Sequence, residues 1–246
     1  MTYAPAMTTI LEVLRGDPLS RPLCDENVAN TLRGQLEELA DGVESGLVLR
    51  TPRGDSVNIA PTTGRVRGML VHQLVRLAAA GYDWRNPAVD ALVAWRANAP
   101  AELVAEVARF DADERAQLRA DLDAHAVVLR RALGTLAPGW LARSAVRARL
   151  VLAGGRLTLV DVIDLMVGVV GPRASVALVD VTSSPLGADA EDRVAYHALC
   201  QTLRTSHAPL TSALVSTATG DVLYRSVDDD LLARAVRYVR GAVESS

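Results

Sequence analysis

Hydrophobic and polar positions near the start of the chain follow the spacing of an amphipathic helix. The segment DENVANTLRGQLEELADGV carries apolar side chains at intervals of three or four positions: Val28, Leu32, Leu36 and Leu39. This spacing places them on one face of a helix. Asp25 precedes the first apolar residue, where a carboxylate can accept a backbone N–H of the first turn. We therefore expect a helix that begins after Asp25.

Helical spacing returns after a segment rich in Pro, Gly, Ser and Thr. That segment, RTPRGDSVNIAPTTGR, predicts a loop, preceded by a short strand at 46–50. The next segment, RVRGMLVHQLVRLAAAG, predicts a helix with an apolar side formed by Met69, Leu70, Leu74 and Leu77. Residues 86–136 are compatible with helix throughout, with breaks expected near Pro100 and Asp111.

The spacing changes from helical to extended near Pro138. Residues 142–170 cluster β-branched and apolar side chains around Gly154 and Gly155, which predicts two strands joined by a tight turn. The apolar run ASVALVDVTSS predicts a strand that is buried on both faces. A helix at 190–206, one further strand within ALVSTATGDVLYRS and a closing helix at 228–243 complete the order.

This order predicts an α/β fold with a mixed central sheet flanked by helices and a helical N-terminal region. The strands 157–165 and 176–181 should be neighbours in the sheet. We divide the chain into an N-terminal helical and loop region, 1–64, and a main region, 65–246, with a helical insertion at 86–136. The two regions are expected to form one compact domain, since 246 residues that are 50% hydrophobic can fill a single large core.

Composition narrows the classes of protein that fit. No apolar run approaches the roughly 18 to 20 residues that a membrane span requires, so we expect a cytoplasmic protein without a membrane partner. The two cysteines, Cys24 and Cys200, lack the CxxC spacing of a zinc ribbon, and two reduced thiols are the simpler interpretation.

Every basic residue of the chain is arginine. Lysine is absent from the 26 basic residues, so no lysine amine can take part in catalysis. The net charge of -3 exerts no overall attraction on nucleic acid, which would need a local arginine patch. The candidates for such a patch are Arg15, Arg21, Arg33, Arg65 and Arg67.

Two aspartates stand where carboxylates could hold a metal ion. Asp164, in VIDLMVG, and Asp180, in VALVDVTSS, lie toward the ends of two predicted strands. Carboxylates at adjacent strand ends can bind Mg²⁺ or Mn²⁺ for phosphodiester cleavage. The alternative is that both are ordinary polar residues at strand ends. Asp161 should face away from Asp164 because side chains three apart on a strand lie on opposite faces.

The order of short motifs resembles the RecB-like branch of the PD-(D/E)XK nucleases. GMLVH contains Gly68 and His72, which are similar to the family's Gly-x-x-x-His on a helix. Asp164 and Asp180 stand in the family's hydrophobic-Asp-hydrophobic and Asp-x-Lys positions. In DRVAY, Asp192 and Tyr196 occupy the positions of Gln-x-x-x-Tyr. The resemblance covers approximately 65–243 and implies a restriction-endonuclease-like fold.

The resemblance also implies a catalytic site, and the sequence departs from the family pattern at several positions of that site. Asp164, Asp180 and Tyr196 would be catalytic, and His72 with the two aspartates would bind Mn²⁺ or Mg²⁺; a histidine hydrogen-bonded at the edge of the core is the alternative for His72. The departures from the family pattern are Thr182 at the lysine position, Asp192 at the glutamine position and Ala145 where many relatives carry glutamate.

Three hypotheses about function follow. The leading one is a degenerate nuclease-like protein that binds DNA or a protein partner with little or no cleavage, because threonine cannot replace a cation beside the phosphate. The second is an active Mg²⁺- or Mn²⁺-dependent DNA nuclease in repair or defence, and the third is a non-catalytic structural subunit. Thr182→Lys is the substitution expected to raise cleavage most.

Overall fold

The computed structural model describes residues 10–44, 46–52, 62–136 and 139–246. Seven α-helices lie within these residues: α1 (Glu26–Ala40), α2 (Thr62–Ala79), α3 (Pro87–Arg96), α4 (Ala101–Ala108), α5 (Ala112–Leu133), α6 (Ala190–Thr205) and α7 (Asp229–Glu244). The strands are β1 (Leu47–Arg50), β2 (Arg143–Leu152), β3 (Leu157–Gly168), β4 (Val176–Thr182), β5 (Thr211–Ser216) and β6 (Val222–Ser226). The predicted α/β class is confirmed. Of the loop predicted over 50–65, residues 53–61 lie outside the described residues, and the prediction is wrong at its end, where α2 already begins at Thr62.

The strands form one mixed sheet of six strands in the order β1-β3-β4-β5-β6, with β2 paired to β3. β3 and β4 are antiparallel neighbours, as predicted for 157–165 and 176–181, whereas β4 and β5 are parallel. The single strand predicted within ALVSTATGDVLYRS is wrong, since this segment forms most of the antiparallel pair β5 and β6. Gly220, with a φ of 82°, turns the chain there, and Ser216 N–H donates to Asp221 O across the turn at 2.9 Å.

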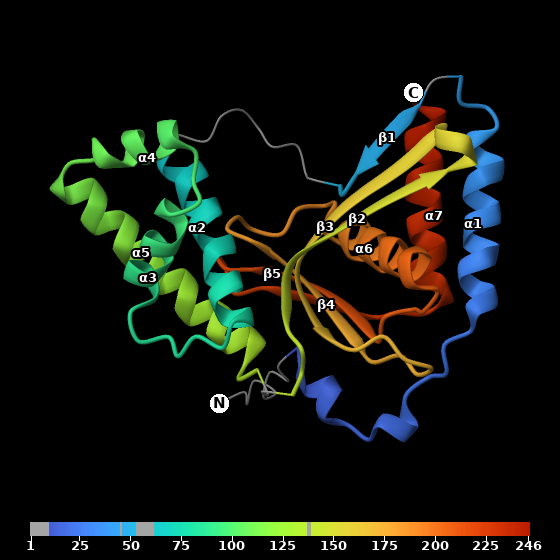
Figure 1. Cartoon of the computed structure of the whole chain (residues 1–246), viewed down its shortest axis with the longest axis horizontal. Helices are drawn as coiled ribbons and strands as arrows, with labels where there is room; N and C mark the ends of the chain where they lie inside the picture. The colour runs from blue at the N-terminus through green and yellow to red at the C-terminus, as the bar shows by residue number, and fades with distance from the viewer. Residues whose placement is uncertain (1–9, 45, 53–61, 137–138) are drawn as a thin grey trace, which may run out of the picture.

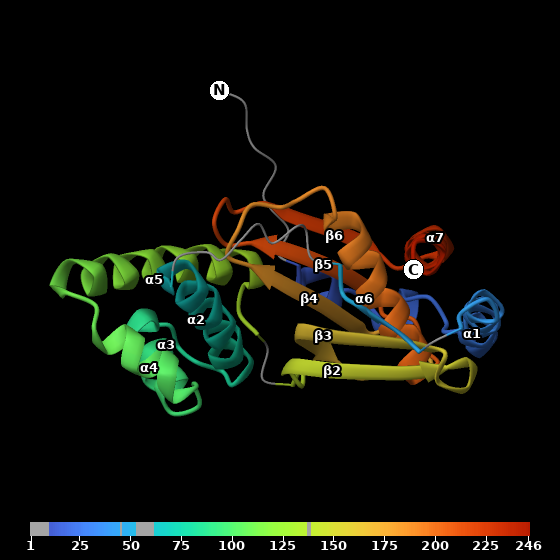
Figure 2. The same ribbon diagram turned by 90° about the horizontal axis from the view of Figure 1, so that it is seen from above.

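Helices cover the sheet in two groups, seen in Figures 1 and 2: α2 to α5 lie together at one side, and α1, α6 and α7 lie at the other. α1 packs on α6 and α7 through Leu32 and Leu36, and β1 pairs with β3. Residues from 1–64 thus share a core and the sheet with the main region.

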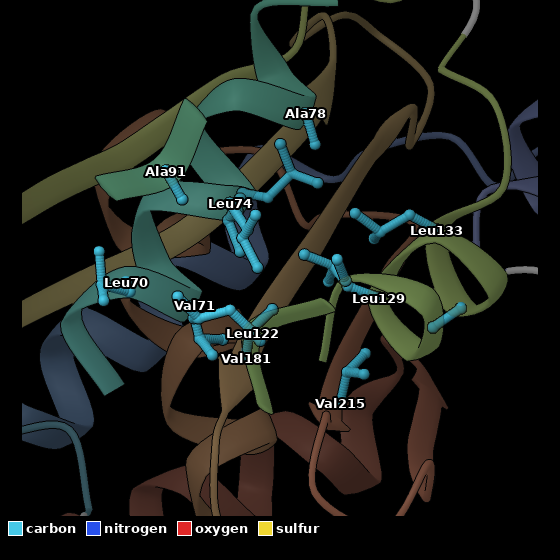
Figure 3. Packing of buried hydrophobic residues seen from close by; sticks show 14 of the residues in the cluster. Leu70, Val71, Leu74, Ala78, Ala91, Leu122, Leu129, Leu133, Val181 and Val215 are labelled. Carbon is cyan, nitrogen blue, oxygen red and sulfur yellow. The ribbon is translucent and has the colours of Figure 1, made fainter. Parts of the chain in front are cut away.

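The helical insertion shares its core with the sheet. Figure 3 shows Leu70 and Leu74 of α2 packed among side chains of α5, with Val181 of β4 and Val215 of β5 close by. Leu70 and Leu74 are fully buried, as predicted, while Met69 and Leu77 are partly buried. Since this packing extends from α2 to the end of β4, it holds α2 firmly beside the point where β3 and β4 separate.

Candidate active site

The candidate site lies where β3 and β4 part. Their pairing ends at Leu165 and Val179, and one further step in the same register sets Asp164 opposite Asp180. At this point the backbone N–H of Val181 donates to both carboxylates, at 2.9 Å to Asp164 Oδ2 and at 3.1 Å to Asp180 Oδ1. The two aspartates predicted from the sequence are therefore brought together.

The regular geometry of β3 is interrupted at Asp164. The β2–β3 register passes directly from Ser144–Leu165 to Val146–Ile163 and omits the pair of Asp164 and Ala145. Ala145 has a φ of 51°, in the left-handed region that non-glycine residues seldom adopt. The β2–β3 ladder therefore has a local break at Ala145, opposite Asp164.

α2 supplies the histidine of the predicted site. Nδ1 of His72 lies 3.0 Å from Asp164 Oδ1, and the imidazole is about half exposed at 47%. One turn earlier, a Cβ on Gly68 would lie 3.4 Å from Ser183 Oγ, so glycine permits the close approach of α2 to the end of β4. Burial raises the pKa of Asp164 to about 6; the hydrogen bond from His72 opposes this rise and the nearby Asp180 adds to it.

Asp180 is paired with two cations from α6. Its Oδ2 accepts from Nη2 of Arg193 and lies 3.1 Å from Nε2 of His197. Burial alone would raise the pKa of Asp180, but His197 and Arg193 together hold it well below its usual range. Asp180 is consequently an ionised carboxylate whose charge is already compensated inside the protein.

His197 connects Asp180 to a third buried carboxylate. Its Nδ1 lies 2.8 Å from Asp161 Oδ1, and the same oxygen accepts a hydrogen bond of 2.6 Å from Thr51 Oγ1. Burial disfavours the imidazolium, yet the carboxylates of Asp161 and Asp180 outweigh it and raise the pKa of His197 to about 10. The buried network of Asp161, His197, Asp180 and Arg193 therefore contains two negative and two positive charges.

These contacts do not fit a divalent metal ion at the predicted ligands His72, Asp164 and Asp180. The oxygens of Asp180 face Arg193, His197 and the Val181 N–H, and those of Asp164 face His72 and the same N–H. An ion such as Mg²⁺ or Mn²⁺ needs free carboxylate oxygens and would be repelled by the two cations. Among the described residues, no group of three His, Cys, Asp or Glu side chains is arranged to hold a metal.

A large cleft opens above the two aspartates, between α2 and α3 on one side and the sheet on the other. Its volume is about 1690 Å³. The residues that line it include Thr51, Arg65, His72, Arg76, Trp95, Ala145, Val162, Asp164, Asp180, Thr182, Asp189 and Arg193. The indole N–H of Trp95 and Nε of Arg193 are buried and find no acceptor among the described residues. Oδ2 of Asp189, which also lines the cleft, is likewise buried without a partner among those residues, so the lining holds both unpaired donors and an unpaired carboxylate oxygen.

Thr182 and Tyr196, two further positions that the resemblance singles out, differ from each other in their surroundings. Thr182, at the family's lysine position, lines the cleft, and its Oγ1 accepts from Ser184 N–H at 3.2 Å. Tyr196, predicted to be catalytic, does not line it: its side chain is fully buried, and its hydroxyl donates to Leu49 O at 3.1 Å. Tyr196 therefore connects α6 to β1 and lies apart from the cleft lining, while its catalytic role stays a prediction.

The sequence interpretation missed His197, Arg193 and Asp161. His197 belongs to no motif of the sequence, yet it is 1% exposed and lies between two carboxylates. Asp161 and Asp164 do face different helices, α6 and α2, as strand alternation predicts, yet Asp180 brings both into one network. The available signal was that Arg193 and His197 are four apart and therefore share a helix face.

Of the five candidate arginines, Arg65 lines the cleft. The other four are engaged elsewhere: Arg15 stacks on Trp140, Arg21 donates to Leu14 O, Arg33 donates to Leu203 O and Arg67 lies 3.6 Å from Asp121. Arg76 and Arg193, which the sequence interpretation did not select, line the cleft in their place.

A scan against protein-family models finds no match to this sequence, and a search of curated proteins finds none either. No helix in the described parts of the chain combines the length and the apolarity needed to cross a membrane.

The buried network predicts how stability depends on pH. Because the folded state raises the pKa of His197 from 6.5 to about 10, its contribution to the free energy of unfolding is complete below pH 6.5 and is lost as pH rises toward 10. We expect urea unfolding at several pH values to show this loss in the wild type and a flatter profile in His197→Gln. Parallel profiles for the two proteins would contradict a charged His197 in the folded state.

Proposed function

We propose that this chain is a non-cleaving, PD-(D/E)XK-like protein that binds nucleic acid in the cleft above Asp164 and Asp180. The order of the motifs, their placement on a helix beside two neighbouring strands and the mixed sheet support the likeness to that family. The main support for the absence of cleavage is the pairing of Asp180 with Arg193 and His197.

The chemistry of cleavage explains why this pairing matters. A metal-dependent nuclease uses carboxylates to hold a cation against the phosphate and to generate the attacking hydroxide. Here the charge of Asp180 is balanced by two side chains that cannot activate water, because guanidinium stays protonated and the pKa of His197 is about 10. Thr182 supplies no cation beside the phosphate either.

The lining of the cleft supports nucleic acid as its ligand. Arg65 and Arg76 are exposed along it, and within the described residues neither is ion-paired with an acidic side chain. Unpaired arginines attract phosphates and release counterions from a nucleic acid on binding.

We expect the purified protein to leave plasmid and single-stranded DNA intact with either Mg²⁺ or Mn²⁺. Thr182→Lys should restore little cleavage, although it supplies the family's amine, because Arg193 and His197 still neutralise Asp180. Agarose and denaturing gels provide the measurement.

Asp180→Ala and the milder Asp164→Asn are the controls, each checked for folding by circular dichroism. Wild-type cleavage that both variants abolish would establish the active-nuclease alternative. A protein that neither cleaves nor binds nucleic acid would leave the protein-binding or structural-subunit hypotheses.

A further inference from the structure

The part of the sheet formed by β1, β3 and β2 has two very different faces. One face packs Leu157 and Leu159 of β3 against α1, α6 and α7. On the other face, three valines are exposed: Val48 by 50%, Val151 by 56% and Val162 by 39%. No helix in the described part of the chain buries these valines.

Arginines alternate with the exposed valines on this open face. Arg50 of β1 and Arg149 of β2 are both in register with Val160 of β3, on opposite sides of it, and Arg147 is in register with Val162. All three arginines are exposed, and across the described residues none is ion-paired with a carboxylate. We call Val48, Arg50, Arg147, Arg149, Val151 and Val162 the basic sheet face.

The basic sheet face is continuous with the cleft. Val162 belongs to both, and Thr51, the residue after Arg50, also lines the cleft. Alternate residues of a strand lie roughly 7 Å apart, and neighbouring strands are about 4.8 Å apart. The three guanidinium groups are thus distributed across the open sheet beside the mouth of the cleft.

We propose that a single-stranded nucleic acid held in the cleft continues across the basic sheet face. This inference rests on the proposed function. An open sheet that presents arginines beside apolar side chains suits a flexible single strand, whose phosphates meet the arginines while its bases contact the valines. The grooves of a duplex instead accept a helix or a two-stranded ribbon.

Oligonucleotides of two lengths test the inference. Fluorescence anisotropy is measured with labelled oligothymidylates of about 6 and about 16 nucleotides, which span the usual range of site sizes. Arg147→Glu/Arg149→Glu should weaken binding of the longer oligonucleotide about tenfold and leave the shorter one nearly unchanged. For the longer oligonucleotide, the slope of the logarithm of the binding constant against the logarithm of the salt concentration should become shallower by about 1.4. Each lost phosphate contact removes roughly 0.7 from this slope.

Arg115→Glu/Arg119→Glu provides a control with the same change of net charge on the exposed surface of α5. Equal weakening of both lengths, or weakening by the control variant as well, would show a general charge effect and overturn the inference. Unchanged binding of the longer oligonucleotide would also overturn it and leave the proposed function standing. Binding of a duplex as tight as that of the single strand would overturn the choice of ligand, and failure of the wild type to bind either length would overturn both proposals.

Discussion

Asp161→Ala is expected to lower the free energy of unfolding by about 3 to 5 kcal/mol, the usual cost of removing one partner of a buried ion pair. The side chain of Asp161 is completely buried and contacts both His197 and Thr51. Its loss leaves the His197 imidazolium beside Asp180, whose charge is also shared with Arg193. Urea denaturation at neutral pH, followed by circular dichroism, measures the change.

Two further variants separate the network from general effects of charge. Asp113→Ala removes an exposed carboxylate from the first turn of α5 and should cost about 1 kcal/mol or less. The double variant Asp161→Ala/His197→Ala should cost less than the sum of the two single variants, because removing both groups leaves no isolated imidazolium. Additive losses would show that the two residues act independently, and an Asp161→Ala loss below about 1 kcal/mol would contradict the burial argument.

Arg65→Glu/Arg76→Glu is expected to weaken binding of single-stranded DNA by at least about tenfold. The slope of the logarithm of the binding constant against the logarithm of the salt concentration should become shallower by about 1.4. Both arginines line the cleft and are exposed, so the change reverses charge at the ligand without removing packed side chains. Anisotropy titrations with the shorter oligothymidylate at several salt concentrations give the affinity and its slope.

The same control pair, Arg115→Glu/Arg119→Glu, changes the net charge equally on α5. Binding should be nearly unchanged in this control, because neither arginine lines the cleft and exposed charges away from a ligand are screened at ordinary salt. If the Arg65→Glu/Arg76→Glu protein bound as the wild type does, nucleic acid would not occupy the cleft. If the control weakened binding equally, net charge rather than the cleft would explain the effect.

Local patterns in the sequence were sufficient to predict most elements. The three- to four-residue apolar spacing of 65–81 predicts α2, and the apolar run before Asp180 predicts the buried strand β4. Asp25 caps α1, while Asp111 and Glu114 form a capping box at α5, close to the predicted break. These features depend on residues a few positions apart, so their periodicity and chemistry can be identified without the fold.

Motif order also predicted which strands would meet at the candidate site. Asp164, Asp180 and His72 converge, because a hairpin strand and the following buried strand are neighbours and α2 packs beside their point of separation. Tyr196 shows the limit of such transfer. Its spacing in the helix matches the motif, yet its hydroxyl bonds to a β1 carbonyl rather than lining the cleft.

Only the tertiary structure decided the charge state of the site. Thr51 and Asp161 are 110 positions apart, and His197 follows Asp161 by 36 and Asp180 by 17, so no local pattern connects them. Their hydrogen bonds depend on how α6 crosses the sheet and on the irregularity at Asp164 and Ala145. The sequence by itself therefore determined most of the elements and the position of the carboxylates along them, because burial follows helical and strand periodicity. The partners of those carboxylates were decided by packing, because a buried charge must be compensated by whichever groups the fold places within a few ångströms.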